Sequence, residues 1–239
     1  MRNKIAASLL GLALTVSAFA SPLPASAADD AFSETQKKEL HNIIREYMLA
    51  NPELLNEMIQ KLQVVERENQ EKQARDAIAS NADKIFRSAE DVVIGNPGGN
   101  VTVVEFFDYN CGYCKRSMAD VLRLTEEDEN VRVVMKEFPI FGEHSQFAAK
   151  AALASKKQGK YWEFHQALMK ERQVTKDNTL DIAKSVGLDV DALKLEMENP
   201  LYDRVLAENT QVAQALGMQG TPAFIVDSKV NYGYVPANE

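Results

Sequence analysis

The sequence predicts an α/β fold preceded by a helical N-terminal segment. An apolar, strand-like run at residues 101–109 passes directly into a Cys-x-x-Cys motif and a helix-forming stretch. A second such run, residues 131–138, is followed by a long helical stretch over residues 145–216 and then by two short strand-like runs. Residues 28–90 contain no glycine and a single proline, Pro52. Such a composition is typical of a helical segment.

The N-terminus resembles a secretory signal. Arg2 and Lys4 supply the positive charge, and residues 5–20 form the apolar core. A small-x-small cleavage site lies at residues 25–27, with an alternative at residues 18–20. The apolar core is too short and wrongly flanked for a stable membrane span, which disfavours the alternative of an uncleaved anchor.

Cleavage would remove residues 1–27 and export the protein to an oxidising compartment. The sequence has no retention signal of the Lys-Asp-Glu-Leu type, so a bacterial periplasm is the simplest location. Losing two basic residues and no acid changes the formal charge from −8 to −10. Such an acidic protein is a poor partner for nucleic acid or anionic lipid.

Residues 28–90 carry two helix-start signals. Ser33 and Gln36 form a capping-box pattern, and Asn51-Pro52 predicts a second helix with Asn51 as the N-cap. The second helix has an apolar stripe and then becomes polar over residues 66–76. The stripe needs a partner surface, either a second copy of the chain or the rest of this one, and we expect homo-oligomerisation. Its members are Leu54, Leu55, Met58, Ile59, Leu62 and Val65.

From Asp91 onward the pattern becomes that of a mixed domain, residues 91–239. Short strands are predicted at residues 92–94, 101–108 and 131–138, and the last of these ends at Pro139. The helical stretch is divided by Gly187 and ends at Gly217, each a typical position after a helix C-terminus. A strand pair at residues 223–226 and 230–234 completes the domain.

The only two cysteines, Cys111 and Cys114, form the Cys-x-x-Cys motif. A strand that leads into this motif at the start of a helix is the redox arrangement of thioredoxin-like proteins. Unpaired N–H groups and the helix dipole favour a thiolate on Cys111, and Cys114 is near enough to resolve a mixed disulfide. A zinc site would need four ligands, and a structural bridge would close almost no loop.

Two further positions are candidates for the same site. Thr221-Pro222 precedes a strand, where thioredoxin-like proteins place a cis-proline facing the sulfurs, and the free backbone of Thr221 could pair with an extended peptide. Glu105 lies in the strand before the motif, on the face opposite Val104. It is either a proton acceptor beneath Cys114, or an edge-facing or ion-paired residue with Lys136 as the possible partner.

The sequence resembles the DsbA-like branch of the thioredoxin superfamily. The resemblance covers residues 91–235, and it is carried by Phe106–Lys115, Phe138-Pro139, the helix at residues 148–154 and Gly220–Phe224. It implies a thioredoxin fold with an inserted helical domain at about residues 143–216. It also implies a nucleophilic Cys111, a resolving Cys114 and a cis-Pro222.

The N-terminal segment, through residues 47–55, is similar to the leader of the Scs-type (suppressor of copper sensitivity, component C) proteins. This similarity implies trimerisation and disulfide shuffling linked to copper stress. The Gly112-Tyr113 pair resembles that of DsbC-type isomerases rather than the Pro-His of DsbA, which argues for a milder oxidant. Family members usually continue into a C-terminal helix, whereas this sequence stops at Glu239.

These features predict a periplasmic thiol-disulfide oxidoreductase, with isomerase or reductase activity expected. Its partners would be misfolded or oxidised exported proteins and a membrane thiol reductase that donates electrons. No cofactor is expected. Two alternatives remain open: a Cu(I)-binding protein that uses Cys111 and Cys114 as soft ligands, and a dithiol oxidase. The three histidines are scattered along the sequence, which favours surface or core roles over metal binding.

Overall fold

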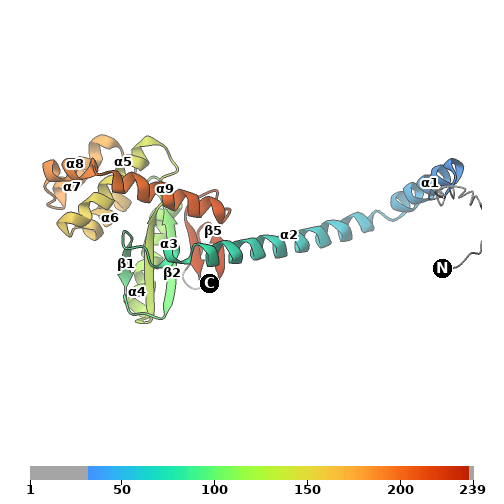
Figure 1. The fold of residues 1–239 in the computed structure, drawn as a ribbon, viewed down its shortest axis with the longest axis horizontal. Helices are drawn as coiled ribbons and strands as arrows, with labels where there is room; N and C mark the ends of the chain where they lie inside the picture. The colour runs from blue at the N-terminus through green and yellow to red at the C-terminus, as the bar shows by residue number, and fades with distance from the viewer. Residues whose placement is uncertain (1–31, 237–239) are drawn as a thin grey trace, which may run out of the picture. The chain divides into compact units, whose positions relative to one another are not determined.

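The computed structural model describes residues 32–236, and the chain divides into two compact units, residues 1–59 and 60–239 (Figure 1). The expected signal peptide, residues 1–27, lies outside the described residues. Among the helices of the described part, none is long and apolar enough to cross a membrane.

In the N-terminal unit, helix α1 (Glu34–Ala50) begins at the predicted capping box. The Ser33 hydroxyl accepts from the Gln36 backbone N–H at 3.3 Å, and the Gln36 side chain accepts from the Ser33 N–H at 2.8 Å. The prediction for Asn51 is wrong. Its side chain donates to the Tyr47 carbonyl at 2.7 Å and caps the end of α1, instead of starting helix α2 (Glu53–Ser80).

The apolar side chains of α1 and of the first half of α2 are exposed. No described residue of α1 is buried, although six of its 17 residues are large and apolar. Apolar surface on this scale marks an interaction site in a soluble protein. We call this set the N-terminal apolar surface, and its members are Leu40, Ile43, Ile44, Tyr47, Met48, Leu49, Leu55, Met58, Ile59, Leu62, Val64 and Val65.

A five-stranded sheet organises the second unit, with strand order β1-β3-β2-β4-β5. Strands β2 and β3 are parallel, and every other neighbouring pair is antiparallel. The predicted strands are confirmed, with bounds β1 (Val92–Gly95), β2 (Val101–Phe107), β3 (Val131–Glu137), β4 (Ala223–Val226) and β5 (Lys229–Tyr232).

Both faces of the sheet are covered. Helix α4 (Gly112–Glu127) connects β2 to β3 and packs on the face that carries Val103 and Phe107. Val104 and Phe106 point to the other face, where α3 (Ala82–Phe86), the end of α2 and α9 (Pro200–Ala215) supply the packing. Because side chains alternate along a strand, Glu105 lies on the α4 side, as predicted.

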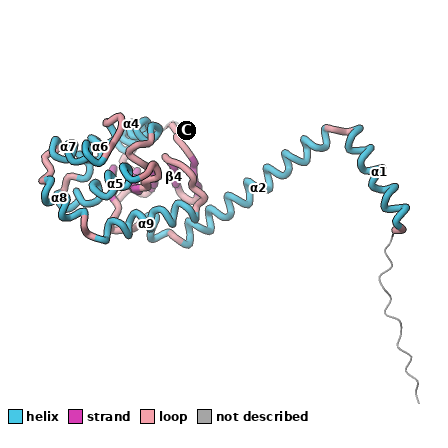
Figure 2. Tube along the Cα trace, turned by 90° about the horizontal axis from the view of Figure 1, so that it is seen from above, coloured by secondary structure: helices cyan, strands magenta, loops and turns pink. Residues whose placement is uncertain are grey.

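The predicted helical insertion is confirmed over residues 143–215. Its helices cluster beside one end of the sheet (Figures 1 and 2), and α9 runs from this cluster back toward β5 (Figure 1). Before α9 the insertion contains α5 (Glu143–Ser155), a 3-10 turn (Lys156–Gln158), α6 (Tyr161–Lys170), α7 (Lys176–Ser185) and α8 (Val190–Met197).

The core of the second unit begins well before Asp91. Ile78 of α2 and Ile85 of α3 are 5% and 0% exposed, and they share a cluster with strands β2 to β4 and with α9. Buried Asp91 also forms an ion pair with buried Lys136 of β3. The sequence pattern indicates a domain that begins at Asp91, but the core of this domain also includes residues before Asp91. Ala74, Ile78 and Ile85 therefore belong to the core of the second unit.

We expect Ile85→Ala to lower the free energy of unfolding by about 2–5 kcal/mol, since it leaves a cavity in a fully buried site. Leu195→Ala is the matched control, because Leu195 is 73% exposed and should change stability by less than about 0.5 kcal/mol. Guanidinium denaturation of the reduced protein measures both. Equal midpoints for the two variants would show that residues 78–86 contribute nothing to this core.

Candidate active site

Cys111 is the N-cap residue of α4, at the end of the loop that follows β2. Its sulfur accepts from the Cys114 backbone N–H at 3.3 Å, and in its protonated form the thiol donates to the Thr221 carbonyl, 3.2 Å away. Cys111 is 4% exposed, whereas Cys114, inside the first turn, is fully buried. The structure thus places Cys111 at the N-terminus of α4 and Cys114 behind it.

The two thiols have opposite acidities. The hydrogen bond from the Cys114 thiol, together with backbone N–H groups at the start of α4, lowers the pKa of Cys111 to about 6. Burial, and then the hydrogen bond to Cys111, raises the pKa of Cys114 far above its ordinary value. Near neutral pH the site therefore holds one thiolate and one thiol. A thiolate is the species that attacks a disulfide.

The loop before β4 faces the Cys111 sulfur. The Thr221-Pro222 peptide bond is cis, as predicted, and the Pro222 carbonyl accepts from the Gly233 N–H at 2.9 Å. The Thr221 hydroxyl oxygen is buried, and the interaction of this side chain with Cys111 is one of the causes that lower the pKa of Cys111. Thr221 thus acts on the Cys111 sulfur.

Glu105 is 2% exposed and accepts from the Ser117 hydroxyl of α4 at 2.7 Å. Burial raises its pKa to about 7, and its charge interacts with those of Cys111 and Cys114. The alternative of an ion pair with Lys136 is wrong, because Lys136 pairs with Asp91 and donates to the Lys84 carbonyl. Glu105 therefore lies near the thiols in a state that can gain or lose a proton around neutral pH.

Asp108, which the sequence analysis did not single out, fixes the loop before the motif. One carboxylate oxygen accepts from the Asn110 N–H and the Ser145 hydroxyl, both at 2.7 Å. The other accepts from the backbone N–H groups of Ile140 at 2.7 Å and Phe141 at 3.1 Å. A buried carboxylate is costly unless it is hydrogen-bonded. An aspartate three residues before a Cys-x-x-Cys motif could have signalled this role.

Two more side chains join the motif to the helical insertion. Asn110 donates to the Val174 carbonyl at 3.0 Å and accepts from the Val174 N–H at 2.8 Å. Lys115 donates to the carbonyls of Glu171 and Arg172 at 2.6 and 2.9 Å, just beyond α6. Both contacts span more than fifty residues of sequence, which is why local patterns did not predict them.

A buried polar cluster lies behind this loop. The hydroxyls of Tyr109 and Tyr161 both donate to one oxygen of Glu137 at 2.8 Å. Burial raises the pKa of Glu137 to about 8, so this carboxyl is protonated at neutral pH. His165 lies 3.1 Å from the Tyr109 hydroxyl, and burial lowers its pKa to about 3. His165 is therefore a neutral residue of the core.

The possible metal ligands are few. Within residues 32–236, no group of three or more His, Cys, Asp and Glu side chains is arranged to hold a metal ion. Cys111 and Cys114 are the adjacent soft donors, and a dithiolate of this kind suits Cu(I). Any metal at this site would thus take its sulfur ligands from these two residues.

Comparison with protein families gives two matches. Residues 102–238, more than half of the chain, match the DSBA-like thioredoxin domain. Residues 36–68 match the copper resistance protein ScsC N-terminal domain.

Two solved structures are similar over most of their length. A thioredoxin-like oxidoreductase from Silicibacter pomeroyi is 48% identical, with a TM-score of 0.65, and the match covers 66% of this chain and 92% of the other. Proteus mirabilis ScsC in a transitional conformation is 31% identical, with a TM-score of 0.63, over 87% of this chain and 94% of the other.

Among curated proteins, disulfide bond formation protein D of Bacillus subtilis is 27% identical over 62% of this chain and 72% of that protein. The chain spans only 22% of the length of the first relatives it matches, such as the Na(+)/H(+) antiporter NhaA 3 of Salinispora tropica, which is 30% identical over 60% of this chain. The shared region is therefore one part of those longer proteins.

We expect thiolate absorbance of the reduced protein to titrate with a midpoint near pH 6, well below the free-thiol value of about 8.5. Because the folded pKa is lowered, the thiolate stabilises the reduced fold above the unfolded pKa, and this contribution is lost as pH falls through about 6. Cys111→Ser, the matched control, should abolish the transition. A midpoint near the free-thiol value would contradict the assignment of Cys111 as the acidic thiol.

We also expect Thr221→Val to shift the redox potential by tens of millivolts, where about 30 mV corresponds to 1.4 kcal/mol. The change keeps the shape of the side chain and removes a buried hydroxyl beside the Cys111 sulfur. Equilibration with glutathione buffers measures the potential. Thr102→Val, at the opposite end of β2, is the control and should leave it unchanged. Equal redox potentials for Thr221→Val and the unaltered protein would show that the Thr221 hydroxyl does not affect the active-site cysteines.

Proposed function

The chain belongs to the family of DSBA-like thioredoxin domains, which are thiol-disulfide oxidoreductases, and we propose that it isomerises or reduces disulfides in exported proteins. One observation carries the proposal. The site pairs an acidic thiol, Cys111, with a buried thiol, Cys114, that stays protonated. Such a pair is reactive in its reduced form, which is the form that an isomerase or a reductase needs at rest.

The reaction begins when the Cys111 thiolate attacks one sulfur of a substrate disulfide. A mixed disulfide forms, and the other substrate sulfur leaves as a thiolate. In isomerisation, a substrate thiolate then attacks the mixed disulfide and frees Cys111. In reduction, Cys114 loses its proton and attacks instead, leaving a Cys111–Cys114 disulfide and a reduced substrate. Glu105, whose charge interacts with both thiols, is the candidate acceptor of that proton.

The resting reduced state requires an electron donor, for which a membrane thiol reductase in a bacterial periplasm is the proposed source. The sequence supports export through its N-terminal signal pattern. In this location, misfolded or wrongly oxidised exported proteins are the proposed substrates.

The N-terminal apolar surface supports a homo-oligomer. Its exposed side chains would lose contact with water in an assembly, which favours association. The match of residues 36–68 to the ScsC N-terminal domain also favours a trimer, as the family resemblance implies. Several Cys111 sites in one assembly could act on the different disulfides of one substrate, which suits isomerisation.

A second candidate function is Cu(I) binding by Cys111 and Cys114. The observation in its favour is the match to a domain named for copper resistance, together with the soft dithiolate. Titrating the reduced protein with Cu(I) and assaying the same sample on scrambled ribonuclease separates the two functions. Rapid unscrambling without copper supports the isomerase, whereas tight copper binding with no unscrambling supports the alternative. A protein isolated fully oxidised would point to a dithiol oxidase.

We expect deletion of residues 28–59 to leave a folded monomer that exchanges disulfides but unscrambles ribonuclease poorly. The deletion removes most of the N-terminal apolar surface and keeps Ala74, Ile78 and Ile85 in the core. Deletion of residues 28–90, by contrast, should destabilise the domain because it removes these core side chains. Light scattering gives the mass, and the ribonuclease assay gives the rate. A monomeric full-length protein would falsify the proposed oligomer. If the protein without residues 28–59 unscrambles ribonuclease as fast as the full-length protein, oligomerisation is not needed for isomerisation.

A further inference from the structure

A groove of about 680 Å³ opens beside the active-site loop, within the second unit. One wall is the later part of α2, and the other is the end of α9 with the loop up to Thr221 and the end of β5. The last turns of α2 lie beside the end of α9 (Figures 1 and 2). The groove is thus built from segments far apart in the sequence.

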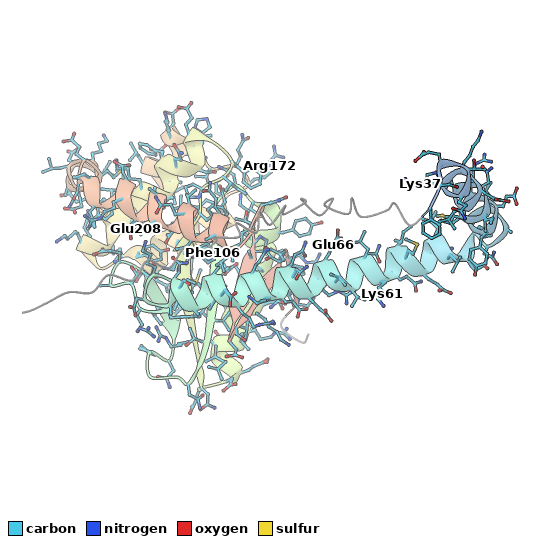
Figure 3. All side chains as sticks on the ribbon, turned by 45° about the vertical axis from the view of Figure 1, so that its right-hand side comes forward. Lys37, Lys61, Glu66, Phe106, Arg172 and Glu208 are labelled. Carbon is cyan, nitrogen blue, oxygen red and sulfur yellow. The ribbon has the colours of Figure 1, made fainter. Side chains whose placement is uncertain are left out.

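The α2 wall is held in place by packing. Lys61 and Glu66, labelled in Figure 3, are exposed to solvent, whereas Ala74 and Ile78 further along the helix are buried. Ile78 packs in the cluster that contains Val212 and Leu216 of the opposite wall. The spacing of the two walls is therefore fixed by the core beneath them.

The polar side chains along the groove are mostly glutamines and carry no charge. Gln70 and Gln73 project from one face of α2, and Gln214 and Gln219 come from the opposite wall. All four side chains are exposed, and within residues 32–236 none of their amides is hydrogen-bonded to another residue. Each amide offers both a donor and an acceptor. The groove therefore presents hydrogen-bonding groups of both kinds that a bound chain could take over from water.

The groove reaches Thr221, whose carbonyl oxygen lies 3.2 Å from the Cys111 sulfur. Cys111 itself does not line the groove. A chain lying in the groove would thus end next to the residue that contacts the attacking sulfur.

We propose that this groove binds an extended segment of the substrate polypeptide next to its disulfide, and that Gln70 and Gln73 of α2 are binding residues for that segment. The inference rests on the proposed function. An extended backbone presents alternating N–H and C=O groups along its length, and glutamine amides can pair with either. A charged wall would select the substrate by charge, whereas an uncharged wall accepts many sequences, as an enzyme for unfolded exported proteins requires.

The test compares two substrates with the full-length chain. One is a disulfide-bridged unfolded protein, scrambled ribonuclease, and the other is hydroxyethyl disulfide, which is too small to occupy the groove. In the Gln70→Ala, Gln73→Ala double variant, the ratio of kcat/KM for the protein to that for the small disulfide should fall about tenfold, or about 1.4 kcal/mol. The loss should appear mainly as a higher KM for the protein.

Gln63→Ala is the matched control, because Gln63 lies on the same helix, is exposed and does not line the groove. Its ratio should not change. Gln73→Trp is a second variant that fills the groove instead of removing hydrogen bonds, and it should lower the same ratio at least as much. A thiolate midpoint that stays near pH 6 in each variant would show that the Cys111 site is intact.

The outcomes separate the inference from the proposed function. If the unaltered protein reduces hydroxyethyl disulfide but the double variant and Gln73→Trp keep the original ratio, the groove does not bind substrate and the inference is overturned. If the unaltered protein reacts with hydroxyethyl disulfide but does not unscramble ribonuclease, the isomerase proposal fails, and the ratio is then measured with a reducible unfolded protein. If it reacts with neither substrate, both proposals are wrong.

Discussion

The Cys111 sulfur lies between the first turn of α4 and the Thr221 carbonyl, and the other features of the site depend on this contact. The two segments are 110 residues apart in the sequence. They meet because β2 and β4 pair antiparallel, with Phe106 opposite Ala223, so that the loop after β2 and the loop before β4 leave the same edge of the sheet. The register between β2 and β4 therefore places Thr221 beside the Cys111 sulfur.

The surroundings of the thiolate limit nearby negative charge. Glu137 has a pKa of about 8 and is protonated at neutral pH, and Glu105, with a pKa of about 7, is only partly ionised there. Asp108 accepts four hydrogen bonds, which compensate its burial. The carboxyls around the active-site loop thus are neutral, partly ionised or hydrogen-bonded, and the Cys111 thiolate can be the stabilised anion of the site.

Helix α2 contributes to three properties of the protein. Its first half carries part of the N-terminal apolar surface, and Ile78 near its end is part of the catalytic-domain core. Between them, Gln70 and Gln73 line the groove beside Thr221. The proposed oligomerisation, the stability of the domain and the proposed substrate binding are therefore expected to respond to changes in a single helix.

The sequence by itself determined the features that arise from neighbouring residues. The strand before Cys111, the helix that starts at the motif, the capping box at Ser33 and the helical insertion all follow from local patterns of apolar, capping and turn-forming residues. Tertiary structure alone decided the partner of Lys136, the hydrogen bonds of Asp108 and the position of Ile85 in the core, because these depend on contacts between distant segments. The role of Asn51 is local, since its side chain bonds to Tyr47 four residues earlier. Its neighbours in sequence end one helix and start the next, and the sequence pattern did not determine which helix end its side chain caps.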